Sequence, residues 1–303
     1  MSIATPPIDA TLPQRAAPPR SRPWYLDVWV QMIRRKPLST VGATIVLVML
    51  AAAVGADHIS PYGFAETSLR ERFIAMNGAH WLGTDQLGRD LLTRLIHGAR
   101  VSLYVGFGAV LIGSALATAI GILSAYFGGR VDMLVQRGVD AWMAFPPLLL
   151  LMSIMSLVGP SAWNITIVLG VAFGIQNSRV VRGVALGIKE HTYIESARAM
   201  GSGHLAIATR HILPNTLPTI IVVATTGLST VILTEASLSF LGLGVPPPFP
   251  TWGGMLSLAG LDHMYQAPWL AIWPAVALSL AVFGFNMLGD GLRDLLDPRL
   301  RGG

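Results

Sequence analysis

The 303-residue sequence contains no cysteine, and only 12% of its residues are charged. Without cysteine the chain has no disulfide framework, no thiolate nucleophile and no cysteine-ligated metal. A soluble domain typically carries about 25% charged residues, whereas 52% of this chain is hydrophobic. The shortage of charge therefore indicates an integral membrane protein. The formal net charge of +5 is accordingly interpreted as a signal of membrane orientation and not of nucleic-acid binding.

Lysine is also scarce, because Lys36 and Lys189 are the only two. A P-loop requires Gly-Lys followed by Ser or Thr to hold nucleotide phosphates, and neither lysine follows a glycine. The H-E-x-x-H metal motif is missing, and the Gly-x-Ser starts at Gly159 and Gly227 lack the closing glycine of a nucleophile elbow. The sequence thus predicts no catalytic residue, metal site or cofactor in this chain, and no enzymatic activity. The histidines lack ligand spacing and are expected to be mostly solvated loop residues: His58, His80, His97, His191, His204, His211 and His263.

Six apolar blocks approach the length of about 20 mostly apolar residues that crosses a membrane. They predict an all-α integral membrane protein with six transmembrane helices. Residues 1–23 are polar and proline-rich and are expected to form a disordered tail, and residues 24–37 an amphipathic interfacial helix. The six predicted spans are Leu38–Ala56, Val101–Phe127, Ala141–Val158, Trp163–Val181, Thr216–Leu233 and Trp269–Leu288.

Basic residues are distributed unequally between the two sides of these spans. With the N-terminus inside, 16 of the 21 Lys and Arg residues lie on the inner segments. Because cytoplasmic loops carry the excess of Lys and Arg, both termini and the polar loop between the fourth and fifth spans are predicted to be cytoplasmic. The five basic residues of the outer segments are Arg70, Arg72, Arg89, Arg94 and Arg100.

The polar loop between the fourth and fifth predicted spans is itself expected to fold. Thr192 can cap a short helix with Glu195 as its capping-box partner, and Gly201 stands where a C-cap glycine belongs. Ser202 can cap a second short helix that Pro214 would end. Two short helices joined at a glycine would form a rigid projection suited to docking on another protein. An ordinary amphipathic connector is the alternative.

The same loop resembles the E-A-A…G…I-x-L-P motif of permease subunits of ABC importers. Ser196 stands where the motif has Ala, and His211 stands where it has Ile, although Ile212 beside it could supply the apolar contact. In that family the loop forms the coupling helix that docks on the ATP-hydrolysing subunit. The resemblance implies this coupling role for Glu195, Ser196, Ala197, Arg198, Gly201, His211, Leu213 and Pro214.

Three further motifs resemble the peptide and nickel branch of these permeases. They are the Gly-Thr-Asp and Gly-Arg-Asp pair of residues 83–90, the segment 234–254, and the C-terminal stretch 289–299. The first pair predicts turns, with Asp90 capping an amphipathic helix that leads into the second span; a role toward the substrate is the alternative. On that helix Arg94 and His97 fall off the apolar face.

Two spans carry features of their own. Gly113, Ala117 and Gly121 repeat at four-residue spacing in the second span, a pattern that lets helix backbones approach closely in lipid. Their partner could be another span of this chain or a second subunit. The third span contains Phe145-Pro146-Pro147, which predicts a kink.

The segment after the fifth span is apolar but interrupted by glycine and proline, which is tolerated at membrane depth only inside protein or around a cavity. Glu235 lies at the edge of that span and is either a functional carboxylate or one that reaches back to the interface. We assign Glu235, Phe240 and Trp252 to the translocation path or the outer gate.

The resemblance covers nearly all of residues 80–300 and implies a type I permease subunit of an ABC importer in the bacterial inner membrane. It implies dipeptides or oligopeptides as substrates, with glutathione or nickel as alternatives. The implied partners are a second homologous permease, two ATP-binding subunits that hold ATP and Mg, an extracytoplasmic substrate-binding protein and membrane lipid. The chain would then divide, after its N-terminal tail and interfacial helix, into a first span with outer segment (38–100), a permease core (101–290) and a C-terminal cytoplasmic tail (291–303).

The sequence fits two other classes of membrane protein, an ion-coupled secondary transporter and a scaffold, less well than an importer. An ion-coupled secondary transporter is disfavoured because the central parts of the six predicted spans contain no Asp, Glu, Lys, Arg or His, whereas such carriers usually place ionisable groups there. A scaffold that transports nothing would not require the folded loop or the interrupted outer segment.

Overall fold

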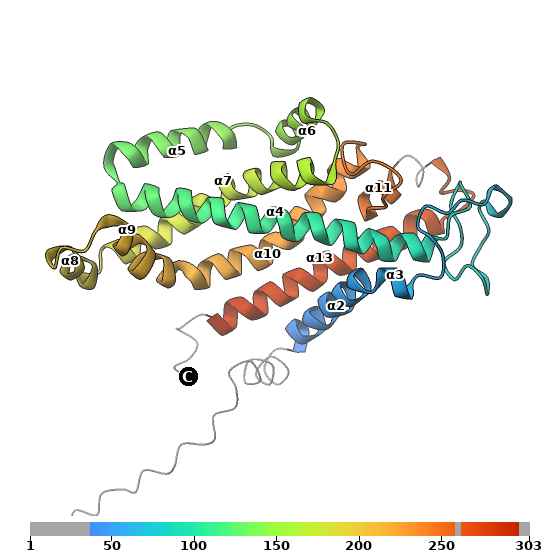
Figure 1. Cartoon of the computed structure of the whole chain (residues 1–303), viewed down its shortest axis with the longest axis horizontal. Coiled ribbons are helices and arrows are strands. Elements are labelled where there is room, and N and C mark those ends of the chain that lie inside the picture. Colours follow the sequence, from blue (N-terminus) through green and yellow to red (C-terminus); the bar gives the residue numbers. More distant parts are fainter. Residues whose placement is uncertain (1–36, 258–261, 297–303) are drawn as a thin grey trace, which may run out of the picture.

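The structure, a computed structural model, describes residues 37–257 and 262–296, and helices dominate this part of the chain (Figure 1). The predicted tail of residues 1–23, nearly all of the predicted interfacial helix and residues 297–303 lie outside the described residues. The helices are α2 (Pro37–Val54), α3 (Ala56–Ile59), α4 (Leu91–Phe127), α5 (Gly129–Met143), α6 (Pro147–Val158), α7 (Ala162–Lys189), α8 (Thr192–Ala199), α9 (His204–Ile207), α10 (Leu213–Phe240), α11 (Trp252–Leu256) and α13 (Trp269–Leu296).

Four of the described segments are long and apolar enough to cross a membrane: Pro37–Val54, Leu91–Phe127, His204–Phe240 and Trp269–Leu295. The bent pair α5 and α6 would make a fifth span. The fourth predicted span corresponds to α7, which is long enough at 28 residues but less apolar than the others, because Asn164, Gln176 and Arg179 interrupt it. The helical membrane architecture is therefore confirmed, and α7 is the span whose composition alone identifies it least clearly.

The third predicted span differs most from its expected form. Instead of one kinked helix, α5 and α6 meet at 89°, and α6 has only 12 residues. Pro147 occupies the first position of α6, where the missing N–H costs nothing and the fixed φ favours a new helix. The two consecutive prolines therefore end one helix and begin another.

The small residues of α4 pack against α7 of the same chain, so their partner is another helix of this chain. A Cβ on Gly113 would lie 2.6 Å from the Gly170 carbonyl oxygen, and one on Gly121 would lie 2.8 Å from that of Ser178. Gly174 meets Leu116 and the Gly113 carbonyl in the same way. The contacts advance together along both sequences, so α4 and α7 run parallel. The intervening helices α5 and α6 carry the chain from the end of α4 back to the start of α7.

The fifth predicted span is longer than expected at both ends. One helical run extends from His204 to Phe240 and includes a π-helical segment at Ala208–Ile212. Pro214 was predicted to end a short helix, but it lies in the first turn of α10. Proline is tolerated in a first turn, and the π-helical segment before it loosens the backbone pattern, so the chain continues as helix. Glu235 consequently lies inside α10.

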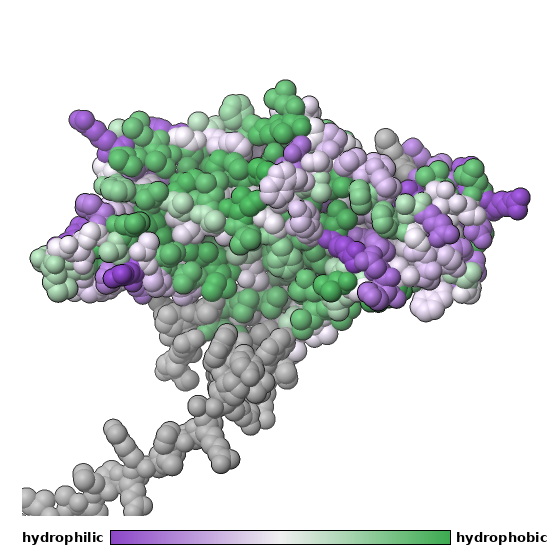
Figure 2. Space-filling model, in the orientation of Figure 1, coloured by the Kyte–Doolittle hydropathy of each residue, from purple (hydrophilic) through white to green (hydrophobic). Residues whose placement is uncertain are grey.

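The remaining long helices, α2 and α13, form an antiparallel pair. Gly42 of α2 packs against Met287, and Gly291 of α13 packs against Ser39. The last helix continues to Leu296, past residue 291 where the tail was expected to start. Figure 1 shows α8 and α9 at one end of the long axis and the loops of residues 60–90 at the other, and Figure 2 shows a broad apolar surface between two polar ends.

Candidate functional site

Helix α8 ends in a Schellman motif built on Gly201. The Ser202 N–H donates to the Ala197 carbonyl at 3.0 Å, and the Gly201 N–H donates to that of Arg198 at 2.9 Å. Gly201 has φ +81°, a backbone conformation that glycine adopts without the steric cost other residues incur. The predicted C-cap role of Gly201 is therefore confirmed.

The predicted N-terminal caps are not formed. His191, not Thr192, is the N-cap residue of α8 and makes no side-chain cap bond, so the capping box with Glu195 is absent. The Ser196 hydroxyl instead donates to the Thr192 carbonyl at 3.0 Å. The second helix starts at His204 after Gly203, two residues beyond the predicted Ser202 cap.

Four apolar side chains hold this loop on the ends of α4 and α7. Ile194, Ile207 and Ile212 are fully buried and Ala197 nearly so. They share one hydrophobic cluster with residues of the two long helices, namely Ala117, Ile122, Ala125, Tyr126, Val181, Ala185 and Ile188. Ile212 supplies the apolar contact that His211, only half-buried, does not. Because the loop shares a packed core with two long helices, displacing it would disturb the packing of both helices. We call residues 190–214 the elbow.

The elbow also presents an exposed surface. Met200 is 80% exposed and Leu205 is 77% exposed, and Glu195, Arg198 and Pro214 of the same elbow are exposed as well. Large apolar side chains ringed by charges are typical of a surface that a partner protein covers. Of the residues implied by the motif, Ala197 is buried and supports the elbow from inside.

A hydrogen bond that the sequence did not reveal joins the elbow to α4. Tyr126 Oη lies 2.7 Å from His204 Nδ1, and the Arg198 guanidinium stands 5.3 Å from the centre of the Tyr126 ring. Lys189 Nζ donates to the Ala125 carbonyl at 3.0 Å. His204 was predicted to be a free loop histidine; it is exposed but bonded. The 78-residue separation of the pair leaves no local pattern from which it could be predicted.

The two helices of the bent pair, α5 and α6, contact the rest of the chain through different kinds of interaction. Helix α5 is tied to α7 by two ion pairs, Asp132 with Arg182 and Asp140 with Arg179. Arg182 Nε lies 2.6 Å from Asp132 Oδ1. Helix α6 carries no charged residue, so it depends on apolar packing of Leu151 and Met155.

Glu235 is completely buried rather than reaching back to an interface. Its carboxylate accepts hydrogen bonds from the Ser239 hydroxyl at 2.6 Å and the Ser102 hydroxyl at 3.3 Å. It therefore joins α10 to α4. With 0% exposure it has no surface to offer a substrate in this conformation.

Trp252 is buried as well, and only Phe240 of the predicted path residues is exposed, at 38%. The Trp252 indole N–H donates to the Leu95 carbonyl at 3.1 Å, and its ring packs on Gly98 of α4. The structure thus brings Glu235 and Trp252 together as packing of α10 and α11 against α4. Neither lines an open path here.

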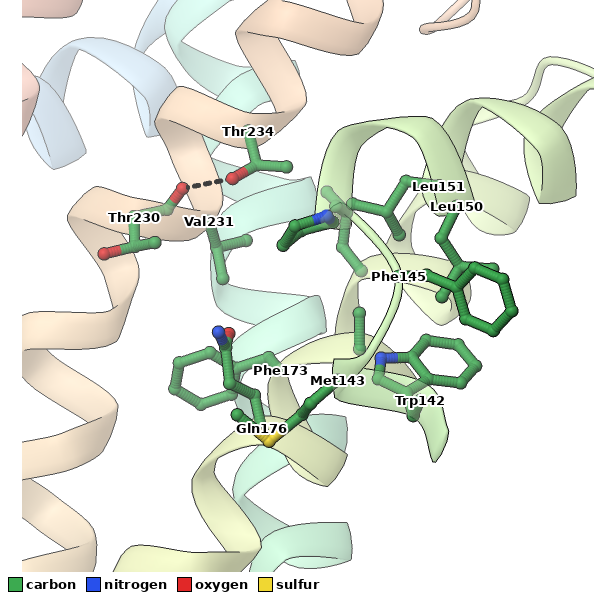
Figure 3. A pocket seen from close by; sticks show the side chains of 13 residues that line it. Trp142, Met143, Phe145, Leu150, Leu151, Phe173, Gln176, Thr230, Val231 and Thr234 are labelled. Carbon is green, nitrogen blue, oxygen red and sulfur yellow. Dashed lines mark hydrogen bonds between the residues drawn. The ribbon is translucent and has the colours of Figure 1, made fainter. Parts of the chain in front are cut away.

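A cavity of about 240 Å³ opens between the bent pair, α7 and α10 (Figure 3). Trp142 and Phe145 come from the bend, Gln176 from α7, and Thr230 and Thr234 from α10. Figure 3 shows the Thr234 hydroxyl donating to the Thr230 carbonyl within a mostly apolar wall. Sequence reasoning missed this cavity because the 89° bend creates it.

The Gly-Thr-Asp and Gly-Arg-Asp pair forms turns and caps, as predicted. Gly83 and Gly88 have φ values of +84° and +72°. Asp90 caps α4 through the Thr93 N–H at 2.8 Å and also lies 2.9 Å from His80 Nδ1. The Trp269 indole N–H donates to the Thr84 carbonyl at 3.2 Å, which fixes the outer loop on α13.

Two residues of this region differ from their expected environment. Arg94 and His97 are buried, each 8% exposed, because α3 and the loop that follows it to residue 64 cover that side of α4. His97 Nε2 lies 3.3 Å from Asp57 Oδ1. The Arg100 guanidinium donates to Asp57 at 3.1 Å and lowers the pKa of that carboxyl. His80 is buried too, so the expectation of solvated histidines is wrong at positions 80 and 97.

Within residues 37–257 and 262–296, no group of three or more His, Asp or Glu side chains is arranged to hold a metal ion. The described residues thus present an exposed apolar surface on the elbow, a buried carboxylate between α10 and α4, and a cavity beside the bent pair.

Comparison with known proteins identifies the family. Residues 117–302 match the family described as binding-protein-dependent transport system inner membrane component. A dipeptide transport system permease protein, DppC, from Alkalihalophilus pseudofirmus is 38% identical over 287 residues, 94% of each chain. The glutathione transport system permease protein GsiD of Pectobacterium atrosepticum is 40% identical over 296 residues, 96% of each chain.

A third relative and a solved structure agree. A putative peptide transport system permease protein from Brucella suis is 40% identical over 271 residues, 89% of this chain and 90% of the relative. An inward-facing structure of the MetNI methionine ABC transporter matches with a TM-score of 0.55 and 20% identity, over 67% of this chain and 96% of that one. This last likeness concerns the fold alone. The chain belongs to the family of inner membrane components of binding-protein-dependent transport systems, and it is the permease subunit of an ABC importer.

Proposed function

We propose that this chain forms half of the translocation path of an importer for dipeptides or oligopeptides. The observation that carries the proposal is the match to dipeptide and peptide permeases along nearly the whole chain. Glutathione is the second candidate substrate, because a glutathione permease matches over a similar length at similar identity. Glutathione is itself a small peptide-like molecule, so both candidates call for a path of similar size and polarity.

The exposed face of the elbow is the proposed docking surface for a separate ATP-binding subunit. Met200 and Leu205 would provide apolar contacts, and Glu195 and Arg198 would provide flanking charges. ATP and Mg would be bound by two such subunits. Closure of these subunits on ATP would move the elbow, and the shared cluster of apolar side chains would move α4 and α7 with it.

The substrate path is proposed to run along the cavity of Figure 3, completed by a second, homologous permease. Its mostly apolar wall with threonine and glutamine groups suits peptides of varied side chains. Phe240 would lie near the outer mouth, and Glu235 and Trp252 would hold the outer gate together. A separate extracytoplasmic binding protein would deliver the substrate to the outer loops.

The chain is a membrane protein, and we propose that the elbow and both termini face the cytoplasm of a bacterial cell. The distribution of Lys and Arg supports this orientation. The opposite placement of the elbow and the 60–90 loops along the long axis is compatible with it. The permease core would correspond to residues 101–290.

Reconstitution tests the proposed substrate class. The complete importer is purified with its partner subunits and binding protein, placed in proteoliposomes, and supplied with ATP inside and labelled dialanine, trialanine, glutathione or Ni²⁺ outside. We expect ATP-dependent uptake of at least one peptide and none of Ni²⁺. Uptake of Ni²⁺ alone would overturn the peptide assignment, and uptake driven by an ion gradient without ATP would overturn the mechanism.

A further inference from the structure

Two arginines share one carboxylate at the outer-loop end of the structure. Arg89 Nε lies 2.6 Å from Asp85 Oδ2, and Arg94 Nε lies 3.6 Å from the same oxygen. The other carboxylate oxygen accepts the backbone N–H groups of Leu87 and Arg89 at 2.8 and 3.0 Å. Asp85 is therefore fully engaged, and its single negative charge is divided between two guanidinium groups.

Three of the six nitrogens of these two guanidinium groups make no hydrogen bond or ion pair with the described residues. Arg94 Nη1 donates to the Phe64 carbonyl at 3.1 Å, whereas Arg94 Nη2 and both terminal nitrogens of Arg89 make no hydrogen bond to the described residues. Both side chains are about nine-tenths buried. The three nitrogens without a protein partner are not themselves fully enclosed, so they can donate to an acceptor that enters from outside the protein.

These arginines line a recess that could hold such an acceptor. A cavity of about 330 Å³ lies between Arg89, Arg94 and Gln86 on one side and the glycine- and proline-rich segment before α11 on the other. No carboxylate among the described residues lines it. Glu235 lies behind Ser239, whose hydroxyl it binds, and makes no ion pair with either arginine in the described structure.

We propose that Arg89 and Arg94 bind the free carboxylate of a peptide substrate at the outer entrance of the path. Two guanidinium groups offer the planar, paired donors that match a carboxylate, and a recess of about 330 Å³ has room for the end of a peptide. The inference rests on the proposed peptide function, and it names the part of the substrate that the permease itself recognises.

Protection from chemical modification tests the site directly. The assembled importer, in nanodiscs, is treated with the arginine reagent phenylglyoxal, and the labelling of individual arginines is followed by mass spectrometry. The probes are trialanine and its C-terminal amide, each at a concentration that saturates trialanine uptake. We expect trialanine to protect Arg89 and Arg94 and the amide not to. The exposed Arg70 should be labelled equally in all samples.

Three results would overturn the site. The first is equal labelling with and without trialanine, and the second is equal protection by the peptide and its amide. The third is protection by the binding protein without any peptide, because the arginines would then bind an acidic side chain of that protein. Peptide uptake without protection would remove the site and leave the transport function intact. Protection without ATP-dependent peptide uptake would keep the carboxylate site and overturn the proposed transport of peptides.

An Arg89→Gln variant gives an independent measure. The ratio of trialanine uptake to amide uptake is compared in wild type and variant with the same binding protein, so the selectivity of the binding protein cancels. We expect the ratio to fall about tenfold, as for loss of a charge-assisted hydrogen-bond pair. Arg70→Gln should leave it unchanged. Arg89→Lys, which keeps the charge, controls for misfolding, and an unchanged ratio in folded Arg89→Gln contradicts the proposal.

Discussion

Tyr126 Oη lies 2.7 Å from His204 Nδ1, so the end of α4 is hydrogen-bonded to the start of α9. The Tyr126 ring also lies against Arg198 of α8. One side chain thus connects a long membrane helix with both short helices of the elbow. If the elbow receives force from an ATP-binding subunit, this connection is one of the contacts through which the force reaches α4.

Tyr126→Phe should weaken coupling without unfolding the protein. The ring remains packed, and the lost hydrogen bond is worth about 1 kcal/mol. We expect fewer peptides imported per ATP hydrolysed, measured as the ratio of uptake to phosphate release in proteoliposomes. Tyr104→Phe, at an exposed position on the same helix, is the control. An unchanged ratio in Tyr126→Phe would remove this bond from the coupling route.

Gly201→Val should uncouple transport more strongly. The glycine has φ +81°. A residue with a Cβ is destabilised in that conformation by about 1–2 kcal/mol, and a β-branched residue by more. The turn between α8 and α9 should therefore rearrange and displace the exposed face of the elbow. We expect ATP hydrolysis that no longer supports uptake.

The matched control for Gly201 is Gly203→Val. Gly203 has φ −67°, and a Cβ there would meet no atom within 4 Å, so this substitution should keep coupling. Fully coupled transport by Gly201→Val would show that the turn geometry is not required.

Gly113→Val should destabilise the packing of α4 on α7. Its Cβ would lie 2.6 Å from both the Gly170 carbonyl oxygen and the Phe173 ring, and overpacking of this kind costs about 1–3 kcal/mol. We expect a lower midpoint of thermal unfolding in detergent. Gly183→Val on α7 meets no neighbour within 4 Å and should unfold like wild type. Equal midpoints for the two variants would contradict the close packing.

Glu235 provides a test of whether its carboxylate is structural or functional. Glu235→Ala leaves the hydroxyls of Ser102 and Ser239 without their partner, and a buried group left unsatisfied costs about 1–3 kcal/mol. Glu235→Gln keeps the shape and a hydrogen-bonding group. We expect low yields of folded Glu235→Ala and normal uptake by Glu235→Gln. A well-folded Glu235→Gln variant that cannot transport would show that the negative charge itself is needed.

Local sequence patterns predicted the features that depend on local physics. The apolar blocks predicted the long helices, because length and composition determine whether a helix can span lipid. Gly201 and Asp90 were predicted as cap residues because their positions next to helical patterns have few alternatives. The small residues of α4 predicted a close helix contact, although they could not name its partner.

Features that depend on distant contacts could not be predicted. The 89° bend between α5 and α6 looked like an ordinary proline kink, since proline alone does not set the angle. The burial of Arg94 and Glu235 depends on loops and helices far away in sequence. The Tyr126–His204 bond joins residues 78 positions apart, and the cavity of Figure 3 exists only after four helices have packed.

Cross-linking tests most directly whether the elbow contacts the ATP-binding subunit. The chain has no cysteine, so Met200→Cys introduces a unique thiol at a position 80% exposed on the elbow. A bifunctional thiol reagent is applied to the assembled importer, with Met76→Cys on the opposite loops as the control. We expect Met200→Cys to cross-link to an ATP-binding subunit and Met76→Cys not to. Cross-linking of that subunit through Met76→Cys, with none through Met200→Cys, would contradict the coupling role of the elbow.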